Sequence, residues 1–347
     1  MQPMPYTIKF PAGAVQYLYG PLSAIDGLSG DREIIVITDT NIAALYPELE
    51  KRYRVIAIPP GEVHKNQHTA DDIIESLLEM EAHRKTTLVG IGGGLVTDIT
   101  GYVASIYMRG IPYGFVPTTL LGMVDAAIGG KNGINHRLQK NLIGTINQPG
   151  FILYDTTFLK TLPDEEWSNG FAEVIKYGCI FDKSLFDTLS EHNIDYYKQG
   201  NTIDGIIQMC VSWKNQTVVA DEKEKGRRKL LNFGHTAGHA LEILYGLPHG
   251  QAVGIGMVIA CIVSEKLNGL DKNMLLALKA QLKKYNLRTY LNINTTEVME
   301  VLRMDKKRNG DQIDYITLNQ IGESIITTMA FDIIEEALTT FSNAGDN

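Results

Sequence analysis

The sequence predicts an α/β nucleotide-binding domain with a parallel sheet, followed by a mostly α-helical domain. In the first half, short β-rich runs alternate with helical periodicities, as is typical of a parallel sheet with helices on both faces. One of these runs ends in a glycine cluster, Gly92-Gly93-Gly94. After about residue 160, long helical periodicities replace the alternation. We therefore expect two domains, a nucleotide-binding domain over residues 1–160 and a helical metal- and substrate-binding domain over residues 161–347.

The individual elements follow from the same periodicities. Strands are predicted at Glu33–Thr38, Arg54–Ile58, Thr86–Ile91, Tyr113–Pro117, Phe151–Tyr154 and, near the end of the chain, Ile313–Thr317. Helices are predicted at Asp71–His83, Ile99–Tyr107, Glu165–Tyr177, Thr202–Ala220, Thr236–Tyr245, Ala252–Leu267 and Met274–Tyr285.

Composition restricts the classes of function. The chain of 347 residues is 44% hydrophobic and 21% charged, as in soluble globular proteins, and its net charge of −8 argues against nucleic acid or a membrane surface as partner. There is no run of about 18 apolar residues and no signal-peptide pattern. Three scattered cysteines, Cys179, Cys210 and Cys261, have no metal or disulfide spacing. We expect a cytoplasmic protein.

Three of the eight histidines lie close together, at His235, His239 and His249. His235 and His239 are four residues apart, so on a helix both imidazoles leave the same face. Imidazole is the commonest neutral ligand of zinc-like metals. An HxxxH pair by itself is weak evidence for a metal site, and its neighbours strengthen the prediction.

One such neighbour is the pair Glu173 and Lys176, three residues apart on a predicted helix capped by Ser168 or Asn169. One interpretation is a surface ion pair, worth about 0–1 kcal/mol. The apolar residues around the pair favour burial instead, where a carboxylate and an ammonium need partners or a metal. One Glu and two His complete a catalytic zinc site that keeps a position open for substrate.

The glycine cluster is the second neighbour. A predicted strand ends at Gly92-Gly93-Gly94, Asp98 follows four residues later, and a helical segment comes next. Such a turn brings backbone N–H groups to a pyrophosphate. The spacing is not the G-x-G-x-x-G fingerprint, and a turn that serves only chain reversal is the alternative.

Basic side chains near these motifs could hold an anion. The segment Val124–Asn135 is expected to be a flexible, glycine-rich loop that carries Asp125 and Lys131. Arginine suits bidentate capture of phosphate or carboxylate, and lysine supplies a point charge. For each base alone, a solvated surface charge is the alternative, but several around one metal indicate a small polyanionic substrate. The candidates are Arg109, Lys131, Lys140, Lys214, Arg228 and Lys307.

These stretches closely resemble the 3-dehydroquinate synthase family of sugar-phosphate cyclases, in the same order along residues 60–310. The matching segments are Gly92–Asp98, Ser105–Gly110, Val116–Leu121, Val124–Asn135, Lys140–Gly144, Gly170–Gly178, Asp221–Glu242 and His249–Met257. The resemblance implies a homodimer that uses NAD⁺ and Zn²⁺, with Co²⁺ able to substitute. It implies conversion of 3-deoxy-D-arabino-heptulosonate 7-phosphate (DAHP), a small anionic phosphosugar acid, into 3-dehydroquinate and phosphate in the shikimate pathway. The steps are transient oxidation, phosphate elimination, re-reduction, ring opening and intramolecular aldol closure.

The resemblance also implies residue roles. The metal ligands are Glu173, His235 and His249, so that His239 contacts substrate instead of metal. The catalytic residues are Lys176, Glu224 and His239, although Glu224 or the substrate phosphate could be the base. The substrate contacts are Arg109 (from the dimer partner), Asp125, Lys131, Asn141, Lys176, Lys214, Arg228, Asn232, His239 and Lys307. The NAD⁺ contacts are Asp39, Glu62, Lys65, Gly92, Gly93, Gly94, Asp98, Thr118, Thr119, Lys140, Lys160, Thr161 and Asn169.

The chain departs from the family pattern at Ala126, Ala127, Asn132 and Gln139. None of these positions is a charged substrate contact, so tuned affinity is expected. Two other functions stay open: another sugar-phosphate cyclase, such as 2-deoxy-scyllo-inosose synthase, or a metal-dependent polyol dehydrogenase. A cyclase for a sugar without a carboxylate would not need Arg228 and the Gly-Gly-Lys131 loop, and a dehydrogenase would show net NAD⁺ reduction.

Overall fold

The computed structural model describes residues 5–30, 32–137, 139–304, 308–309 and 312–345. The chain forms two compact units. Unit 1 is Met1–Leu162 with Lys214–Lys223, and unit 2 is Pro163–Trp213 with Glu224–Asn347. Helix α9, Thr202–Ala220, therefore contributes its first part to unit 2 and its last part to unit 1. The predicted fold class, a parallel α/β domain and a helical domain, is confirmed.

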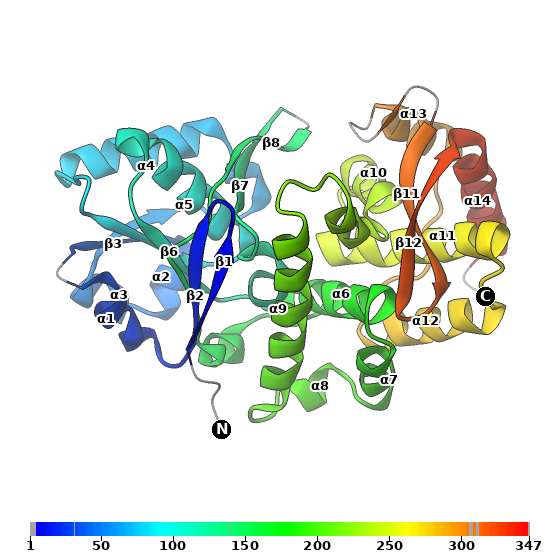
Figure 1. The fold of residues 1–347 in the computed structure, drawn as a ribbon, viewed down its shortest axis with the longest axis horizontal. Helices are drawn as coiled ribbons and strands as arrows, with labels where there is room; N and C mark the ends of the chain where they lie inside the picture. The colour runs from blue at the N-terminus through cyan, green and yellow to red at the C-terminus, as the bar shows by residue number, and fades with distance from the viewer. Residues whose placement is uncertain (1–4, 31, 138, 305–307, 310–311, 346–347) are drawn as a thin grey trace. The chain divides into compact units, whose positions relative to one another are not determined.

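Unit 1 is built on a sheet, which contains seven strands among the residues described (Figure 1). Every neighbouring pair is parallel except β1 and β2, which are antiparallel at one edge. In spatial order the strands are β1 Tyr6–Phe10, β2 Gly13–Tyr19, β9 Phe151–Tyr154, β6 Tyr113–Pro117, β5 Thr87–Gly92, β3 Ile34–Asp39 and β4 Arg54–Ile58. The five strands predicted here are confirmed; β1 and β2 were not predicted.

Helices cover both faces of this sheet (Figure 1). On one face, Ile25 and Leu49 of the short helices pack with Val89 and Val116 of the sheet. On the other face, helix α5 lies close to β5: a Cβ at Gly90 would be 2.8 Å from Thr100 Oγ1. The helices of unit 1 are α1 Ile25–Ser29, α2 Thr40–Leu45, α3 Glu48–Arg52, α4 Gln67–Glu79 and α5 Gly94–Ile106, with the last part of α9.

The segment Val124–Asn135 is not the loop that was expected. Asp125 lies in a π-helical turn, Gly122–Ala126, and Lys131 begins strand β7, Lys131–His136, which pairs with β8, Gln139–Ile146, as an antiparallel hairpin. The glycines and asparagines of this segment interrupt the alternation typical of a strand, so the sequence did not predict β7. Glycine is needed before the strand, at Gly129 and Gly130, where φ is 100° and 68°.

Unit 2 is mostly helical, with a small antiparallel sheet of three strands in its described part. The strands are β10 Arg308–Asn309, β11 Gln312–Gln320 and β12 Glu323–Ala330. The helices are α6 Asp164–Ile180, α7 Lys183–Glu191, α8 Ile194–Tyr197, α10 His235–Tyr245, α11 His249–Asn268, α12 Lys272–Lys284, α13 Thr295–Arg303 and α14 Phe331–Ala344, with the first part of α9. The helices and the strand predicted for this half are confirmed.

Helix α11 is the core of unit 2. Within the described residues it is the one helix long and apolar enough to cross a membrane, but 72% of that window is buried inside the protein, as in the core helix of a globular domain. It approaches α10 very closely, because a Cβ at Gly256 would lie 1.9 Å from the carbonyl oxygen of Gly234. This approach holds the first residues of α10 and α11, His235 and His249, near each other.

We expect Gly256→Ala to lower the free energy of unfolding by about 1–3 kcal/mol, because the added methyl has backbone on the facing side and must push α10 away. Gly254→Ala in the same helix is the matched control. Its nearest neighbour would be 3.4 Å away, so it should be neutral or stabilise by up to about 1 kcal/mol through helix propensity. Urea unfolding measures both variants. Equal stabilities would show that α10 and α11 can separate without cost.

Candidate metal and nucleotide sites

Glu173, His235 and His249 form a cluster in unit 2, with one ligand atom from each residue within 4.8 Å of the others. The Nε2 atoms of His235 and His249 lie 3.3 Å and 3.1 Å from the same carboxylate oxygen, Glu173 Oε1. Glu173 is fully buried. Three ligands at about 2.1 Å from a tetrahedral zinc would be about 3.4 Å apart, so the spacing fits such an ion.

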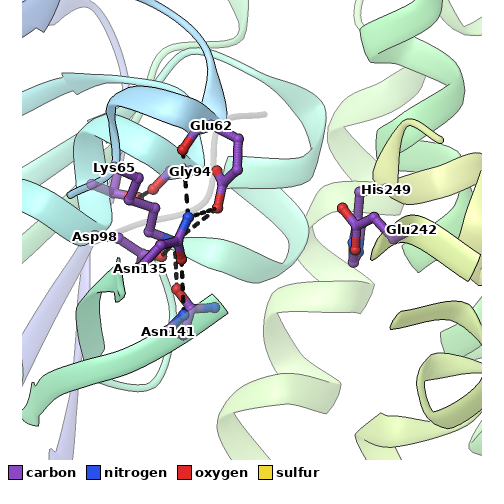
Figure 2. Close-up of polar contacts among 9 residues, drawn as sticks. Glu62, Lys65, Gly94, Asp98, Asn135, Asn141, Glu242 and His249 are labelled. Carbon is purple, nitrogen blue, oxygen red and sulfur yellow. Dashed lines mark hydrogen bonds and ion pairs between the residues drawn. The ribbon is translucent and has the colours of Figure 1, made fainter. Parts of the chain in front are cut away.

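The other ring nitrogens of both histidines face oxygen acceptors. His235 Nδ1 lies 3.1 Å from the backbone oxygen of Phe233, and His249 Nδ1 lies 3.7 Å from Glu242 Oε2. Figure 2 shows Glu242 beside the His249 ring. Metal-binding histidines are usually oriented in this way, with the second nitrogen hydrogen-bonded and the first turned to the metal. The donor set therefore fits a divalent cation.

Glu242 was missed by the sequence reasoning, although a signal existed. It lies three residues after His239 and seven after His235, so all three leave one face of α10. His239 is not part of the close cluster, and its ring lies 5.3 Å from that of His235, between centroids. The structure thus groups the set Glu173, His235 and His249, not the HxxxH pair.

Burial and charge act against each other in this cluster. Burial disfavours ionisation of Glu173, but Lys176 and His235 outweigh it and hold the pKa of the carboxyl well below its usual range. Burial lowers the pKa of His235, although Glu173 opposes this. Burial also acts to lower the pKa of His249, yet hydrogen bonding to Glu173 and Glu242 raises it to about 9. Glu173 is thus held as a carboxylate, the form in which it can bind a metal.

Helix α6 supplies both Glu173 and Lys176, which form a buried ion pair. The surface interpretation of this pair is wrong, because their side chains are 0% and 1% exposed. The predicted cap at Ser168 or Asn169 is also wrong: α6 begins at Asp164, and both residues lie inside it. Asn169 instead accepts a hydrogen bond from the backbone N–H of Gly250 at 3.0 Å, beside His249.

The glycine turn lies at the carboxyl end of β5, in unit 1. Gly93 caps α5 without a side chain of its own, so the first N–H groups of this helix have no side-chain cap. The hydroxyl of Thr118, at the end of the neighbouring strand β6, is buried and has no hydrogen-bond partner among the described residues. Open helix N–H groups and an orphaned hydroxyl at adjacent strand ends fit a bound dinucleotide.

Acidic and basic candidates gather near this turn (Figure 2). Lys65 is 5% exposed, forms an ion pair with Asp98 and donates a 2.6 Å hydrogen bond to Asn141 Oδ1. Burial raises the pKa of Asp98, and Lys65 opposes the shift. Glu62 accepts a hydrogen bond from Asn135, a residue absent from the predicted set, at 2.9 Å. Asp39 ends β3 and caps α2.

The other cofactor candidates are less closely grouped. Thr119 accepts a hydrogen bond from the backbone N–H of Gly122, and Thr161 contacts the hydroxyl of Tyr46. Lys140 and Lys160 are exposed. Asn169 belongs to unit 2, whereas the rest belong to unit 1. The nucleotide assignments therefore stay predictions.

Some substrate candidates contact other predicted site residues. Lys214 lies 2.8 Å from Asp125 Oδ1 in unit 1. In unit 2, Asn232 donates a 2.6 Å hydrogen bond to Glu224. Arg228 is buried and Lys131 is exposed, while Lys307 lies outside the described residues.

Some candidates have an unusual backbone. Arg109, Asn141 and Glu224 have φ of 68°, 50° and 56°, in the left-handed region that non-glycine residues rarely adopt. Strain of this kind is often found at functional sites.

Two of the positions at which the chain departs from the family pattern, Asn132 and Ala126, have a structural explanation. The side-chain amide of Asn132 is buried and donates to the hydroxyl of Tyr113 and to the backbone oxygens of Gly130 and Asn147. The Cβ of Ala126 lies close to Gly94: a Cβ added at Gly94 would be 3.2 Å from it. Asn132 thus fastens the start of the hairpin, and a small residue at 126 leaves room at the start of α5.

Comparison with known proteins agrees with these features. The family model for the N-terminal part of 3-dehydroquinate synthase matches residues 55–169, and the model for its C-terminal part matches residues 170–308. A 3-dehydroquinate synthase from Campylobacter hominis is 39% identical over 320 residues, covering 89% of this chain and 92% of that protein.

Solved structures agree in fold. A 2-epi-5-epi-valiolone synthase from Streptomyces hygroscopicus subsp. jinggangensis, with NAD⁺ and Zn²⁺ bound, has a TM-score of 0.87 at 26% identity, covering 95% of this chain and 97% of that one. A 2-deoxy-scyllo-inosose synthase in complex with carbaglucose-6-phosphate, NAD⁺ and Co²⁺ has a TM-score of 0.86 at 23% identity, covering 97% and 100%.

The glycine turn of unit 1 and the Glu-His-His cluster of unit 2 place the chain in a class of two-unit proteins with a nucleotide site and a divalent-metal site. Within that class, the matched models cover most of the chain. The chain belongs to the 3-dehydroquinate synthase family.

We expect His235→Ala to lose bound metal and turnover together, because a zinc site with three protein ligands rarely survives the loss of one. His239→Ala is the matched control on the same helix face; it should keep its metal and lose turnover. Metal content per protein, measured by mass spectrometry after dialysis, separates the two. Full metal content in His235→Ala would remove this residue from the ligand set.

Proposed function

We propose that this chain is a 3-dehydroquinate synthase that converts DAHP into 3-dehydroquinate and phosphate. The observation that carries the proposal is the cluster of buried Glu173 and His235 with half-buried His249. Lys176 lies beside it, and the chain is 39% identical to a curated enzyme of that name. Such an enzyme belongs to the shikimate pathway, which leads to chorismate and the aromatic amino acids. The three cysteines are buried and form no disulfide among the described residues, which fits a cytoplasmic location.

Glu173, His235 and His249 would hold Zn²⁺ or Co²⁺, which as a Lewis acid would polarise a ring oxygen of the substrate. Lys176 supports this arrangement from the same helix as Glu173. His239 lies one turn after His235 on α10 and keeps its imidazole outside the cluster. We infer that it binds substrate or moves a proton, as we infer for Glu224.

Unit 1 would bind NAD⁺, which accepts a hydride and returns it within one turnover. The N–H groups at the start of α5 would face the pyrophosphate, and the buried Thr118 hydroxyl would gain a partner. Asp39, at the carboxyl end of β3, is suited to the ribose hydroxyls. Lys65 and Asp98 would contribute a neutral pair near the same turn.

The substrate carries a carboxylate and a phosphate, and the chain offers bases for both. Arg228 is buried, so its guanidinium is suited to a bidentate contact with an anion. Lys214 is held by Asp125 and lies in unit 1 with Lys131 and Asn141. Asn232, with Glu224, completes the proposed contacts of unit 2. The net charge of −8 leaves nucleic acid and membrane surfaces as unfavourable partners.

Phosphate release from DAHP tests the proposal, with catalytic NAD⁺ and Zn²⁺, and with EDTA as control. We expect EDTA-sensitive release without net accumulation of NADH, because the hydride is returned. Release from another phosphosugar and not from DAHP would favour a different cyclase. Steady NADH production from a simple polyol would favour a dehydrogenase.

We further propose a homodimer formed through unit 1. Strand β8 pairs only with β7 among the described residues, and Leu142, Ile143 and Ile146 on it are exposed. Ile106 and Met108, at the end of α5, are exposed as well. Apolar residues on an unpaired edge strand favour association with another chain. Arg109, next to Met108, would then reach the partner's substrate.

We expect Leu142→Arg to shift the protein from dimer to monomer, because a charge replaces apolar contact on this edge. Leu276→Arg is the control, since Leu276 is exposed on α12 in unit 2 and should leave the dimer intact. Light scattering after size-exclusion chromatography gives the mass of each variant. A wild-type protein that is monomeric at micromolar concentration would contradict the proposal.

A further inference from the structure

The last part of α9, with the residues that follow it, belongs to unit 1; we call Lys214–Lys223 the α9 tail. Buried polar contacts join both of its ends to distant parts of unit 1. At the first end, Lys214 forms an ion pair with Asp125 and also donates to its backbone oxygen at 2.5 Å. At the other end, Gln148 donates a 2.9 Å hydrogen bond to Glu222.

A further contact involves Tyr17 on strand β2. Its hydroxyl donates a 2.6 Å hydrogen bond to Asn215 Oδ1, across 198 positions of the sequence. Tyr17 is 0% exposed and Asn215 is 2% exposed, so water cannot replace the bond without a rearrangement. Burial raises the pKa of the Tyr17 hydroxyl well above its usual value, which keeps it protonated as a donor.

Lys214 and Asn215 are consecutive on α9, so their side chains leave the helix about 100° apart. One is held by Asp125 and the other by Tyr17. Two contacts in different directions fix the rotation of the helix about its axis.

The contact at Glu222 acts in the same way on the end of the tail. Gln148 packs against Gly130, where a Cβ would lie 2.8 Å from its side-chain carbon. Gln148 therefore joins the tail to the glycine turn that precedes Lys131. Neither Tyr17 nor Gln148 has a role in the family assignments given above.

We propose that Tyr17 and Gln148 are positioning residues that fix the α9 tail, so that Lys214 stays against Asp125 in the geometry that binds substrate. The inference rests on the proposed function only where it treats Lys214 and Asp125 as substrate contacts. The claim that the α9 tail is held in place rests only on the hydrogen bonds of Tyr17 to Asn215 and of Gln148 to Glu222.

The chain offers a matched control for Tyr17→Phe. Tyr154 stacks in the same group of rings, 6.5 Å from Tyr17 between centroids, and is as deeply buried. Its hydroxyl has no hydrogen-bond partner among the described residues. Tyr154→Phe therefore removes the same atom from the same layer without breaking a contact. Gln148→Leu is a second variant that acts on the other end of the tail.

Hydrogen exchange of peptides covering residues 214–223 is measured first, in the full chain with NAD⁺. Tyr17→Phe and Gln148→Leu should each speed exchange there by roughly 2–10-fold, the effect of one neutral hydrogen bond. Tyr154→Phe should leave it unchanged. Equal exchange in Tyr17→Phe and Tyr154→Phe would show that Tyr17 does not fix the α9 tail. This conclusion would hold for any substrate of the enzyme.

Kinetics with DAHP then tests the positioning role. We expect Tyr17→Phe to raise KM by roughly 2–10-fold with kcat within about twofold and NAD⁺ affinity unchanged, because only the substrate contact of Lys214 is loosened. Faster exchange with an unchanged KM would overturn the positioning role. A wild-type protein that releases no phosphate from DAHP would instead refute the proposed function, while the exchange result still decides the fastening.

Discussion

The burial of one carboxylate, Glu173, is the constraint on which unit 2 depends. An ionised carboxylate removed from water loses several kcal/mol of solvation, which only close opposite charge and hydrogen bonds recover. Lys176 comes from the same helix, but His235 and His249 come from the starts of α10 and α11. The three helices must therefore meet at this point. The absence of side chains at Gly234 and Gly256 permits the approach of α10 to α11.

Unit 1 also buries a carboxylate beside a lysine, but the effect on the pKa of the carboxyl is different. Lys65 and Asp98 are both largely buried and neutralise each other near the glycine turn. Burial raises the pKa of Asp98 despite its lysine, whereas Glu173 stays far below its usual range because more positive groups surround it. The cluster of unit 2 is suited to hold a divalent cation. In unit 1, Lys65 pairs with Asp98 and also lies 3.9 Å from Glu62, so the N–H groups of α5 are the feature near the turn best suited to an anion.

Much of the fold could be predicted because its elements are long or strongly periodic. Strands β4, β6 and β9 and helix α9 begin and end at the predicted residues. The hairpin β7–β8 could not be predicted in this way, because glycine and asparagine interrupt its alternation and β8 is exposed on both faces. For the site, spacing alone suggested His235 and His239 as a pair. The family resemblance instead implied Glu173, His235 and His249, and the fold brings these three together from α6, α10 and α11.

Positions such as Tyr17 and Asn215 show a further limit of sequence reasoning. A tyrosine on a strand and an asparagine on a helix are common, and nothing local marks them as partners across the chain. Their contact exists because the sheet edge and the α9 tail are packed together, which is a property of the tertiary structure. Chemical roles can thus be suggested by motifs, whereas the residues that hold those motifs in place become visible only in three dimensions.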